Sequence, residues 1–402
     1  MQFKKIALFL SLSALALPVI AQGFVPDGYV RMRNVATGRY VRVVDNRGSI
    51  DVRRTSADLS ALRTILYYDN VVSDPSSLLY LVYRWSDTTY INKGGVRQIK
   101  EISQTYNVMA QGTDMYSIIG VGLRVCRSGS YYRAFQEESG IRVYLNDSWI
   151  PASDKIGPDD IEGYVLDNDE TKREWAVCQV NSSDDDSYFG ITPTLSIDGK
   201  FYYPLFFGFP FTFHSQGMKA YYVKQIDTEN GICVTEELKG TIPASTPVII
   251  ECQSPNAGDN RLQLLAPGSG NPLTGNRLSG AMFKNDYAAG TGHRNRVDYD
   301  ASTMRILGVT DKGKLGFVTA PAGYDAIDGN SAYLKAQSLP AQLVLMNQGE
   351  YDEFLIEAGV DSPKSDTGIV AWTLDGTPIE AGSLEELQRG IYIVDGHKYI
   401  VR

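Results

Sequence analysis

The fold is decided by residues 29–43, which read YVRMRNVATGRYVRV. Apolar and polar side chains alternate on both sides of residues 36–38, and alternation with a period of two indicates β-strands. The residues Ala-Thr-Gly between the two runs are typical of a turn, because glycine adopts the backbone conformations that tight turns need. The stretch therefore predicts a β-hairpin.

Two later stretches repeat this pattern. At residues 79–91 and 123–133 an alternating apolar run leads into a polar turn, and a tyrosine follows at the same distance. The residues that match are Arg33 and Tyr40, Tyr83 and Tyr90, and Val125 and Tyr132. The hairpins follow one another at intervals of about 40–50 residues, a period typical of repeated supersecondary units.

The composition favours an all-β protein. The chain of 402 residues contains 25 tyrosines and 38 glycines, and 43% of its residues are hydrophobic. Tyrosine suits half-buried strands, because its ring is apolar and its hydroxyl can stay in water. Short alternating runs separated by turn residues are typical of all-β folds. The length is sufficient for two domains and a tail.

The hairpin repeats carry a resemblance to a known fold. Residues 33–41, RNVATGRYV, resemble the first repeat of β-trefoil domains in the ricin-like and related groups, and the strand around Trp175 stands where such domains end. The resemblance covers residues 22–180 and implies a β-trefoil-like domain with Trp175 in its core. The Gln-x-Trp signature of sugar-binding ricin-type repeats is absent, so no binding residues are transferred from that family.

Residues 188–348 resemble a β-sandwich module of exported proteins from Gram-negative anaerobes that use the type IX secretion route. The phrases in common are YPLF at 203–206, KAY at 219–221, IPASTPVI at 242–249 and SAYL at 331–334. The module implies a location rather than a chemistry.

Residues 201–213 are the most aromatic stretch, and we expect buried core strands there rather than a sugar-stacking surface, because so apolar a run requires burial.

Both ends of the chain resemble export signals. Residues 1–21 contain two lysines, an apolar run and small residues before Gln22, which are the parts of a cleavable signal peptide. Residues 368–402 resemble type IX sorting tails, with three short strands separated by Asp-Gly turns. Residues 181–187, which are acidic, and residues 349–367 are predicted linkers. We therefore expect a secreted protein, extracellular or on the outer cell surface, without a transmembrane anchor.

Charge and cysteines narrow the choice of partners. The formal net charge of -9 argues against nucleic acid, because phosphate binding needs a basic face. The four cysteines allow three pairings, of which Cys126 with Cys178 and Cys233 with Cys252 stay within one predicted domain. Buried free thiols are an equal alternative. No CxxC motif or cluster of His and Cys predicts a metal site.

No catalytic set stands out in the sequence. The three histidines, His214, His293 and His397, accompany no recognisable nucleophile motif, so we expect neither an enzyme nor a cofactor. The sequence predicts a non-enzymatic binding protein, a lectin-like adhesin whose partner is a glycan or a host surface protein. A structural surface-assembly protein without a free ligand is one alternative, and a glycan hydrolase with an unrecognised site is another. Candidate contacts are aromatic residues near predicted turns, namely Trp85, Tyr90, Tyr131, Tyr132 and Trp149.

Overall fold

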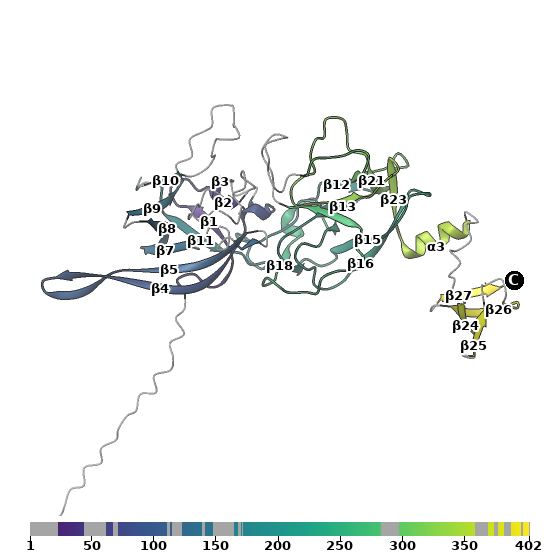
Figure 1. Ribbon diagram of the computed structural model, residues 1–402, viewed down its shortest axis with the longest axis horizontal. Coiled ribbons are helices and arrows are strands. Elements are labelled where there is room, and N and C mark those ends of the chain that lie inside the picture. Colours follow the sequence, from purple (N-terminus) through teal and green to yellow (C-terminus); the bar gives the residue numbers. More distant parts are fainter. Residues whose placement is uncertain are drawn as a thin grey trace, which may run out of the picture. The chain divides into compact units, whose positions relative to one another are not determined.

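The all-β prediction is confirmed (Figure 1). The computed structural model describes residues 23–43, 62–66, 71–110, 113–114, 123–138, 141–147, 165–167, 170, 172–282, 297–357, 369–373, 377–381, 387–394 and 397–401. The chain divides into two units, the first ending at Leu345 and the second beginning at Met346. The predicted signal peptide lies outside the described residues. Within them, no helix combines the length and the apolar character that crossing a membrane requires.

The first sheet of the first unit closes into a barrel. Its strands are β1 (Gly28–Asn34), β2 (Tyr40–Val43), β3 (Leu62–Leu66), β4 (Leu79–Lys93), β5 (Val96–Ala110), β6 (Thr113–Asp114), β7 (Leu123–Ser128), β8 (Tyr131–Glu138), β9 (Ile141–Asn146), β10 (Val165–Asp167) and β11 (Trp175–Gln179). Strands β1, β4, β5, β7 and β8 pair in this order, and β11 pairs with both β8 and β1, which completes the ring. The trefoil assignment, which requires a threefold repeat, stays a prediction.

Trp175 lies in the core of this barrel, as predicted. Its side chain is fully buried, and the indole N–H donates to the backbone carbonyl of Leu145 at 3.1 Å. A buried indole needs such a partner for its N–H group. Apolar side chains from the ring strands complete the core: Val30, Met32, Leu79, Leu81, Tyr106, Val108, Val125 and Ala134.

Two of the three predicted hairpins are present. Strands β1 and β2 form the first, in which Arg33 lies opposite Tyr40. Strands β7 and β8 form the third, but Tyr132 lies opposite Arg127, and Val125 lies opposite an alanine two residues further along. The equal spacing in the sequence therefore located this hairpin without giving its register.

The second predicted hairpin is wrong. Residues 79–93 form the single strand β4, which continues through the polar residues of the predicted turn. Thr88 and Thr89 are β-branched and favour the extended strand. The chain reverses only at Gly94 and Gly95, whose φ angles of 61° and 81° suit glycine and match a two-residue hairpin turn.

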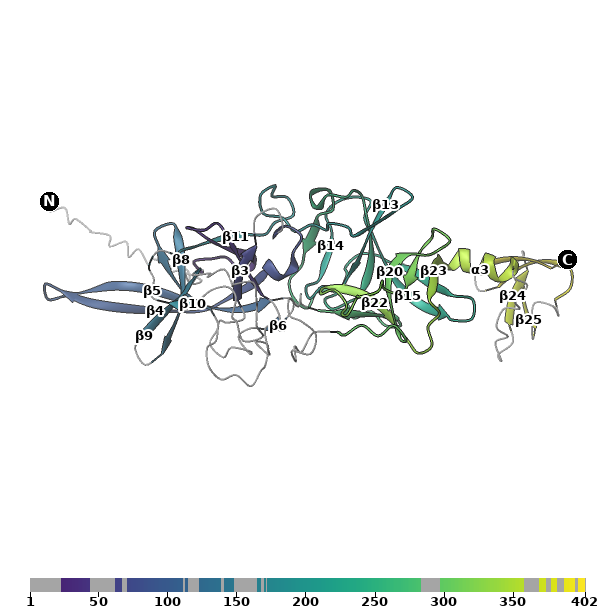
Figure 2. The same ribbon diagram turned by 90° about the horizontal axis from the view of Figure 1, so that it is seen from above.

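The second sheet of this unit is sandwich-like (Figure 2). It contains β12 (Leu195–Ile197), β13 (Lys200–Leu205), β15 (Lys219–Asp227), β16 (Ile232–Leu238), β17 (Val248–Cys252), β19 (Leu278–Ala281), β20 (Met304–Val309), β21 (Leu315–Val318), β22 (Ser331–Lys335) and β23 (Gln342–Asn347). The strand order is β12-β13-β17-β15-β16-β23-β21-β20-β22-β19. Leu205 of β13 also pairs with Ser331 of β22, which connects the second strand from one end of the sheet with the second strand from the other.

An aromatic core joins the two sheets. Phe207, Phe209 and Phe211 are buried, so the prediction that residues 201–213 are core is confirmed. The ring of Phe209 meets that of Tyr29 from β1 edge to face, with centroids 4.9 Å apart. The Tyr29 hydroxyl donates to the carbonyl of Leu265 at 2.5 Å. Because large aromatic surfaces are buried here, this junction stabilises the barrel against the second sheet.

Two arginines add polar contacts to the same junction. Arg31 is 1% exposed, and its side chain donates to Ser77 Oγ at 3.0 Å and to the carbonyl of Tyr188 at 2.9 Å. Arg261 forms an ion pair of 2.7 Å with Asp185, inside the predicted acidic linker, and covers the ring of Tyr188. A buried cation is tolerated only with such partners, so the junction has a defined geometry.

The second predicted linker begins with a helix that the residue pattern did not predict. Helix α3 spans Gln348–Glu357. Asn347 Oδ1 accepts a hydrogen bond from the N–H of Glu350 at 3.0 Å, and Glu350 Oε2 accepts one from the N–H of Asn347 at 2.8 Å. This reciprocal pair is a capping box, which satisfies two backbone donors at the start of a helix. Residues 358–367 lie outside the described residues.

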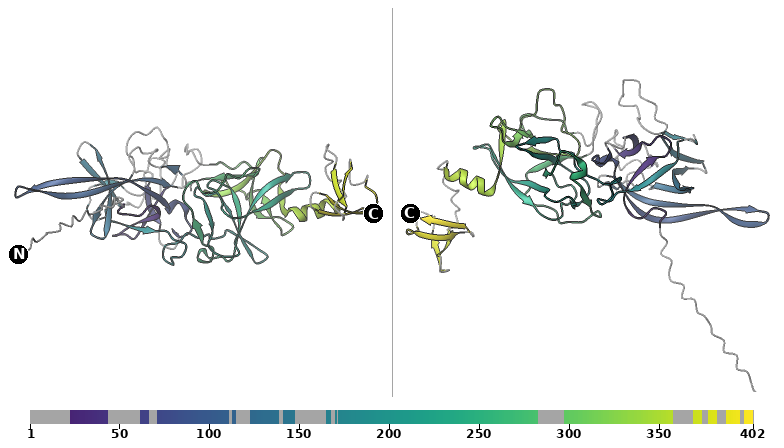
Figure 3. Two further views of the ribbon diagram at one scale, coloured as in Figure 1. Left: turned by 90° about the horizontal axis from the view of Figure 1, so that it is seen from below. Right: turned by 180° about the vertical axis from the view of Figure 1, so that it is seen from behind.

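The second unit also contains the C-terminal sheet (Figure 3). Its strands are β24 (Ile369–Thr373), β25 (Pro378–Ala381), β26 (Gly390–Val394) and β27 (His397–Val401), in the order β25-β24-β26-β27. The sheet has one strand more than the three that the Asp-Gly turns predict. Ala371, Leu387, Tyr392 and Val394 form its core.

Candidate functional site

Strands β4 and β5 continue beyond the barrel as a long two-stranded hairpin (Figures 1 and 3). Strand β4 pairs with β1 through residues 79–81, and β5 pairs with β7 through residues 103–106. Beyond these positions the two strands pair with each other up to the glycine turn. We call residues 84–102 the arm. Every residue from 84 to 100 is exposed.

The arm concentrates exposed apolar side chains. Six of the twelve exposed large apolar residues in the described part of the chain lie on it: Trp85, Tyr90, Ile91, Val96, Ile99 and Ile102. The strand register places Tyr90, Ile99 and Ile102 on one face and Trp85, Ile91 and Val96 on the other. Both faces of the arm are therefore apolar, with Val96 and Ile99 the most exposed at 59% and 58%.

The outer part of the arm is basic. Residues 88–100 include Lys93, Arg97 and Lys100, and no Asp or Glu. The guanidinium carbon of Arg97 lies 3.8 Å from the centroid of the Tyr90 ring. This cation–π contact orders both side chains and covers one side of the ring.

The acidic residues that border this basic stretch are paired with arginines. Asp87 forms an ion pair of 3.3 Å with Arg124 of β7, and Glu101 forms one of 2.6 Å with Arg142 of β9. Their negative charges are thus held toward the barrel. Residues 88–100, the outer part of the arm, therefore carry three cations and no acidic residue.

The structure separates the predicted contact residues. Trp85 and Tyr90 are exposed on the arm but point to opposite faces, so they do not form one stacking platform. Tyr131 is exposed at the turn between β7 and β8. Tyr132 is half-buried against the barrel core, and its hydroxyl donates to a backbone carbonyl at 3.2 Å, which makes it a structural residue. Trp149 lies outside the described residues.

The arm as a unit was not predicted, although the sequence contains its signal. The dipeptide Gly94-Gly95 stands between the runs TTYINK and VRQIKEI, and such a pair between β-branched runs is a strong hairpin signal. The hairpin predicted over residues 79–91 lies before this dipeptide instead. Polar residues occur in this strand because water surrounds it on both faces.

The two predicted disulfides are not formed. All four cysteines are free thiols, and Cys233 and Cys252 belong to different core clusters of the second sheet. Burial raises the pKa of the Cys126 thiol to about 11 and the pKa of the Cys233 and Cys252 thiols to about 12. We call these three the buried thiols. Cys178 is half-buried, and burial raises its pKa as well.

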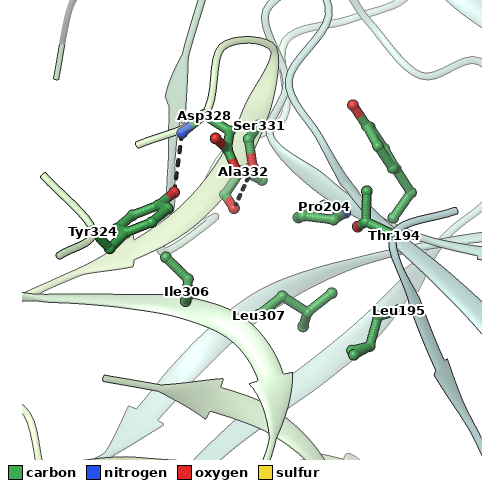
Figure 4. Close-up of a pocket in the computed structure, with 10 residues that line it drawn as sticks. Thr194, Leu195, Pro204, Ile306, Leu307, Tyr324, Asp328, Ser331 and Ala332 are labelled. Carbon is green, nitrogen blue, oxygen red and sulfur yellow. Dashed lines mark hydrogen bonds between the residues drawn. The ribbon is translucent and has the colours of Figure 1, made fainter. Parts of the chain in front are cut away.

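A pocket of about 370 Å³ opens in the second sheet (Figure 4). It is lined by Thr194, Leu195, Tyr203, Pro204, Ile306, Leu307, Tyr324, Asp328, Ser331 and Ala332. The lining mixes apolar side chains with hydroxyl groups and one carboxylate, and it includes no Lys or Arg. The backbone N–H of Asp328 donates to the Tyr324 hydroxyl at 3.1 Å, and the Asp328 side chain is exposed at the rim. Burial raises the pKa of Tyr324 to about 12.

The residues that line the pocket include hydroxyl groups and one carboxylate but no histidine. His214 is exposed elsewhere, and His293 lies outside the described residues. Among the residues with a described position, no group of three or more His, Cys, Asp or Glu side chains could hold a metal ion.

Comparison with protein-family models, with curated proteins and with solved structures finds no match to this chain. The candidate site is therefore defined by its geometry. It consists of the arm, which is apolar and basic, and the pocket, which has a mixed apolar and polar lining with an acidic residue at its rim.

Proposed function

We propose that the protein is a secreted or cell-surface binding protein without enzymatic activity, and that the arm is its contact element. The observation that supports this is the concentration of exposed apolar side chains on one projecting hairpin. Soluble proteins rarely expose such a surface unless a partner covers it. A hairpin that is already paired also loses little conformational entropy when it binds.

The chemistry of the arm favours a protein surface over a glycan. Sugars stack on aromatic rings, and the two aromatic residues of the arm, Trp85 and Tyr90, lie on opposite faces. The other exposed apolar residues are isoleucine and valine, which pack against apolar groups of a protein. A glycan remains the second candidate, with Tyr131 and Trp85 as its contacts.

The test is a binding screen of the purified full chain against glycan arrays, mucins and host surface proteins. Trp85→Ala should weaken the binding that the screen finds by about tenfold or more, since buried aromatic anchors dominate interfaces. Trp372→Ala is the matched control, because Trp372 is 45% exposed, close to the 42% of Trp85, and lies in the second unit. Equal binding by both variants would remove the arm as the contact element.

Export is tested separately. N-terminal sequencing of protein recovered from the culture medium should give Gln22 as the first residue. Recovery of the chain only inside the cell, with Met1 retained, would contradict the proposed location.

A further inference from the structure

We propose that the partner of the arm is a second copy of this chain, and that the end of the arm docks into the pocket of Figure 4 on that copy. The inference rests on the proposed function, because it names the partner of the same contact element. It is argued from the apolar and charged residues of the two surfaces.

The arm requires a partner surface that packs against the side chains on its faces. A two-stranded hairpin is only marginally stable in water unless a further strand or another surface packs on it. Two β-bulges, at Arg84 and Lys100, interrupt its edges. Bulges and lysines on an edge strand oppose the addition of another strand. A partner therefore contacts the side chains of the arm rather than its backbone.

The charge of the arm indicates which kind of partner surface it binds. The whole chain has a net charge of -9, although residues 88–100 contain three cations and no acidic residue. The rest of the chain is therefore more acidic than the total indicates. Two arms would repel each other, whereas the arm of one copy and the acidic surface of another attract.

The pocket fits the end of the arm. Ile91, Val96 and Lys93 lie on the same face of the arm next to the turn. The pocket volume of 370 Å³ exceeds the roughly 300 Å³ at which small-ligand sites begin. The pocket therefore has room for a few aliphatic side chains. With Ile91 and Val96 against the aliphatic part of the mixed lining, such as Ile306 and Leu307, Lys93 meets the exposed carboxylate of Asp328 at the rim.

A lipid surface fits the arm less well than a protein pocket. At the end of the arm, Lys93 lies opposite Val96 in the last pair before the two glycines. Insertion of Val96 into a bilayer would therefore bring this cation into the hydrocarbon with it, which is costly. A pocket with a carboxylate at its rim accepts the same cation without that cost.

Because the arm and the pocket are different patches, the contact is heterologous. Each copy keeps one free arm or one free pocket after it binds, so the contact extends from dimers to longer species. This behaviour distinguishes the proposal from an ordinary symmetric dimer.

The test is sedimentation velocity of the full chain between about 1 and about 100 µM, where weak interfaces form. The wild type should form dimers and longer species, and association should weaken between about 50 mM and about 500 mM salt, because salt screens charge pairs. Two arm variants, Ile91→Ser with Val96→Ser and Lys93→Glu, and the pocket variant Asp328→Lys should each weaken association about tenfold or more. Asp311→Lys is the control, since Asp311 is an exposed acid of the same sheet outside the pocket.

Mixing an arm variant with the pocket variant gives the more specific test. The serine double variant keeps an intact pocket and Asp328→Lys keeps an intact arm, so an equimolar mixture should form dimers but no longer species. The substituted side chains are exposed, and unchanged thermal unfolding of each variant checks that the fold is intact.

Several outcomes would overturn the inference. These are a wild type that stays monomeric throughout, an arm variant that associates normally, or a mixture that stays monomeric. Arm-dependent binding of a monomeric wild type to a glycan or to phosphatidylglycerol vesicles would replace the second copy as partner and leave the proposed function standing. If Trp85→Ala also changed no binding in the screen, the proposed function would fail with it.

Discussion

Replacing Asn260 with alanine should destabilise the second sheet strongly. The Asn260 side chain is fully buried, and its Nδ2 donates to the carbonyl oxygens of Ile191, Ser254 and Asn256 at 2.9, 2.8 and 3.0 Å. Its Oδ1 accepts hydrogen bonds from the N–H groups of Gln253 and Ser254 at 2.8 and 3.3 Å. One amide thus ties the loop after β17 to the segment before β12.

The size of the stability loss depends on which hydrogen-bond partners of Asn260 water can reach. The carbonyl of Ile191 is buried and would lose its side-chain partner, at a cost of about 1–3 kcal/mol, while each part-buried bond contributes about 0.5–1.5 kcal/mol. The lower ends of these ranges give an expected loss of about 3 kcal/mol or more in the free energy of unfolding. Asn256→Ala is the matched control, because this exposed asparagine makes no capping bond with its side chain, and should cost less than about 0.5 kcal/mol.

The assay is urea unfolding of the full chain followed by far-ultraviolet circular dichroism. The Asn260→Ala variant should unfold at a lower urea concentration than the wild type and the control. A loss below about 1 kcal/mol would refute the argument, because it would mean that water or a rearranged loop replaces the lost bonds.

Two further predictions concern the thiols and helix α3. The buried thiols should not react with Ellman's reagent at about pH 8 until the chain is unfolded, because a thiol must ionise to react. Since their pKa values are raised from the ordinary 9.0, their contribution to stability is complete below pH 9 and lost as the pH rises toward 12, so the urea midpoint should fall over that interval. Rapid labelling of the folded chain would contradict this. Glu350→Ala should weaken amide hydrogen-exchange protection in α3 by about 0.5–2 kcal/mol, because it removes half of the capping box, whereas Glu353→Ala, at an exposed position, should not.

Local patterns in the sequence predicted what local physics determines. Residues 29–43 form the expected hairpin because alternation and a glycine turn specify it together. The burial of Trp175 and of residues 207–211 follows from their size and apolar character. The all-β fold class and much of the core could therefore be predicted.

Features that depend on distant parts of the chain could not be predicted in this way. The spacing of Tyr83 and Tyr90 matched the other hairpins, but both residues lie on one strand whose length is fixed by the turn at residues 94–95. The pocket is built from segments around residues 194, 203, 306 and 328, which only the pairing of β13 with β22 brings together. Disulfides and buried free thiols stayed equal alternatives, because the spacing of cysteines does not show which core cluster each one enters.

The continuity of β4 and β5 has a mechanical consequence. The same two strands form part of the barrel wall and the whole of the arm, and each continues from one to the other as a single strand. A force that pulls the arm along its length acts on the bonds from β4 to β1 and from β5 to β7 all at once, parallel to the strands. Those hydrogen bonds share the force instead of breaking one after another. The barrel should therefore resist a force applied along the arm better than a force applied perpendicular to its strands.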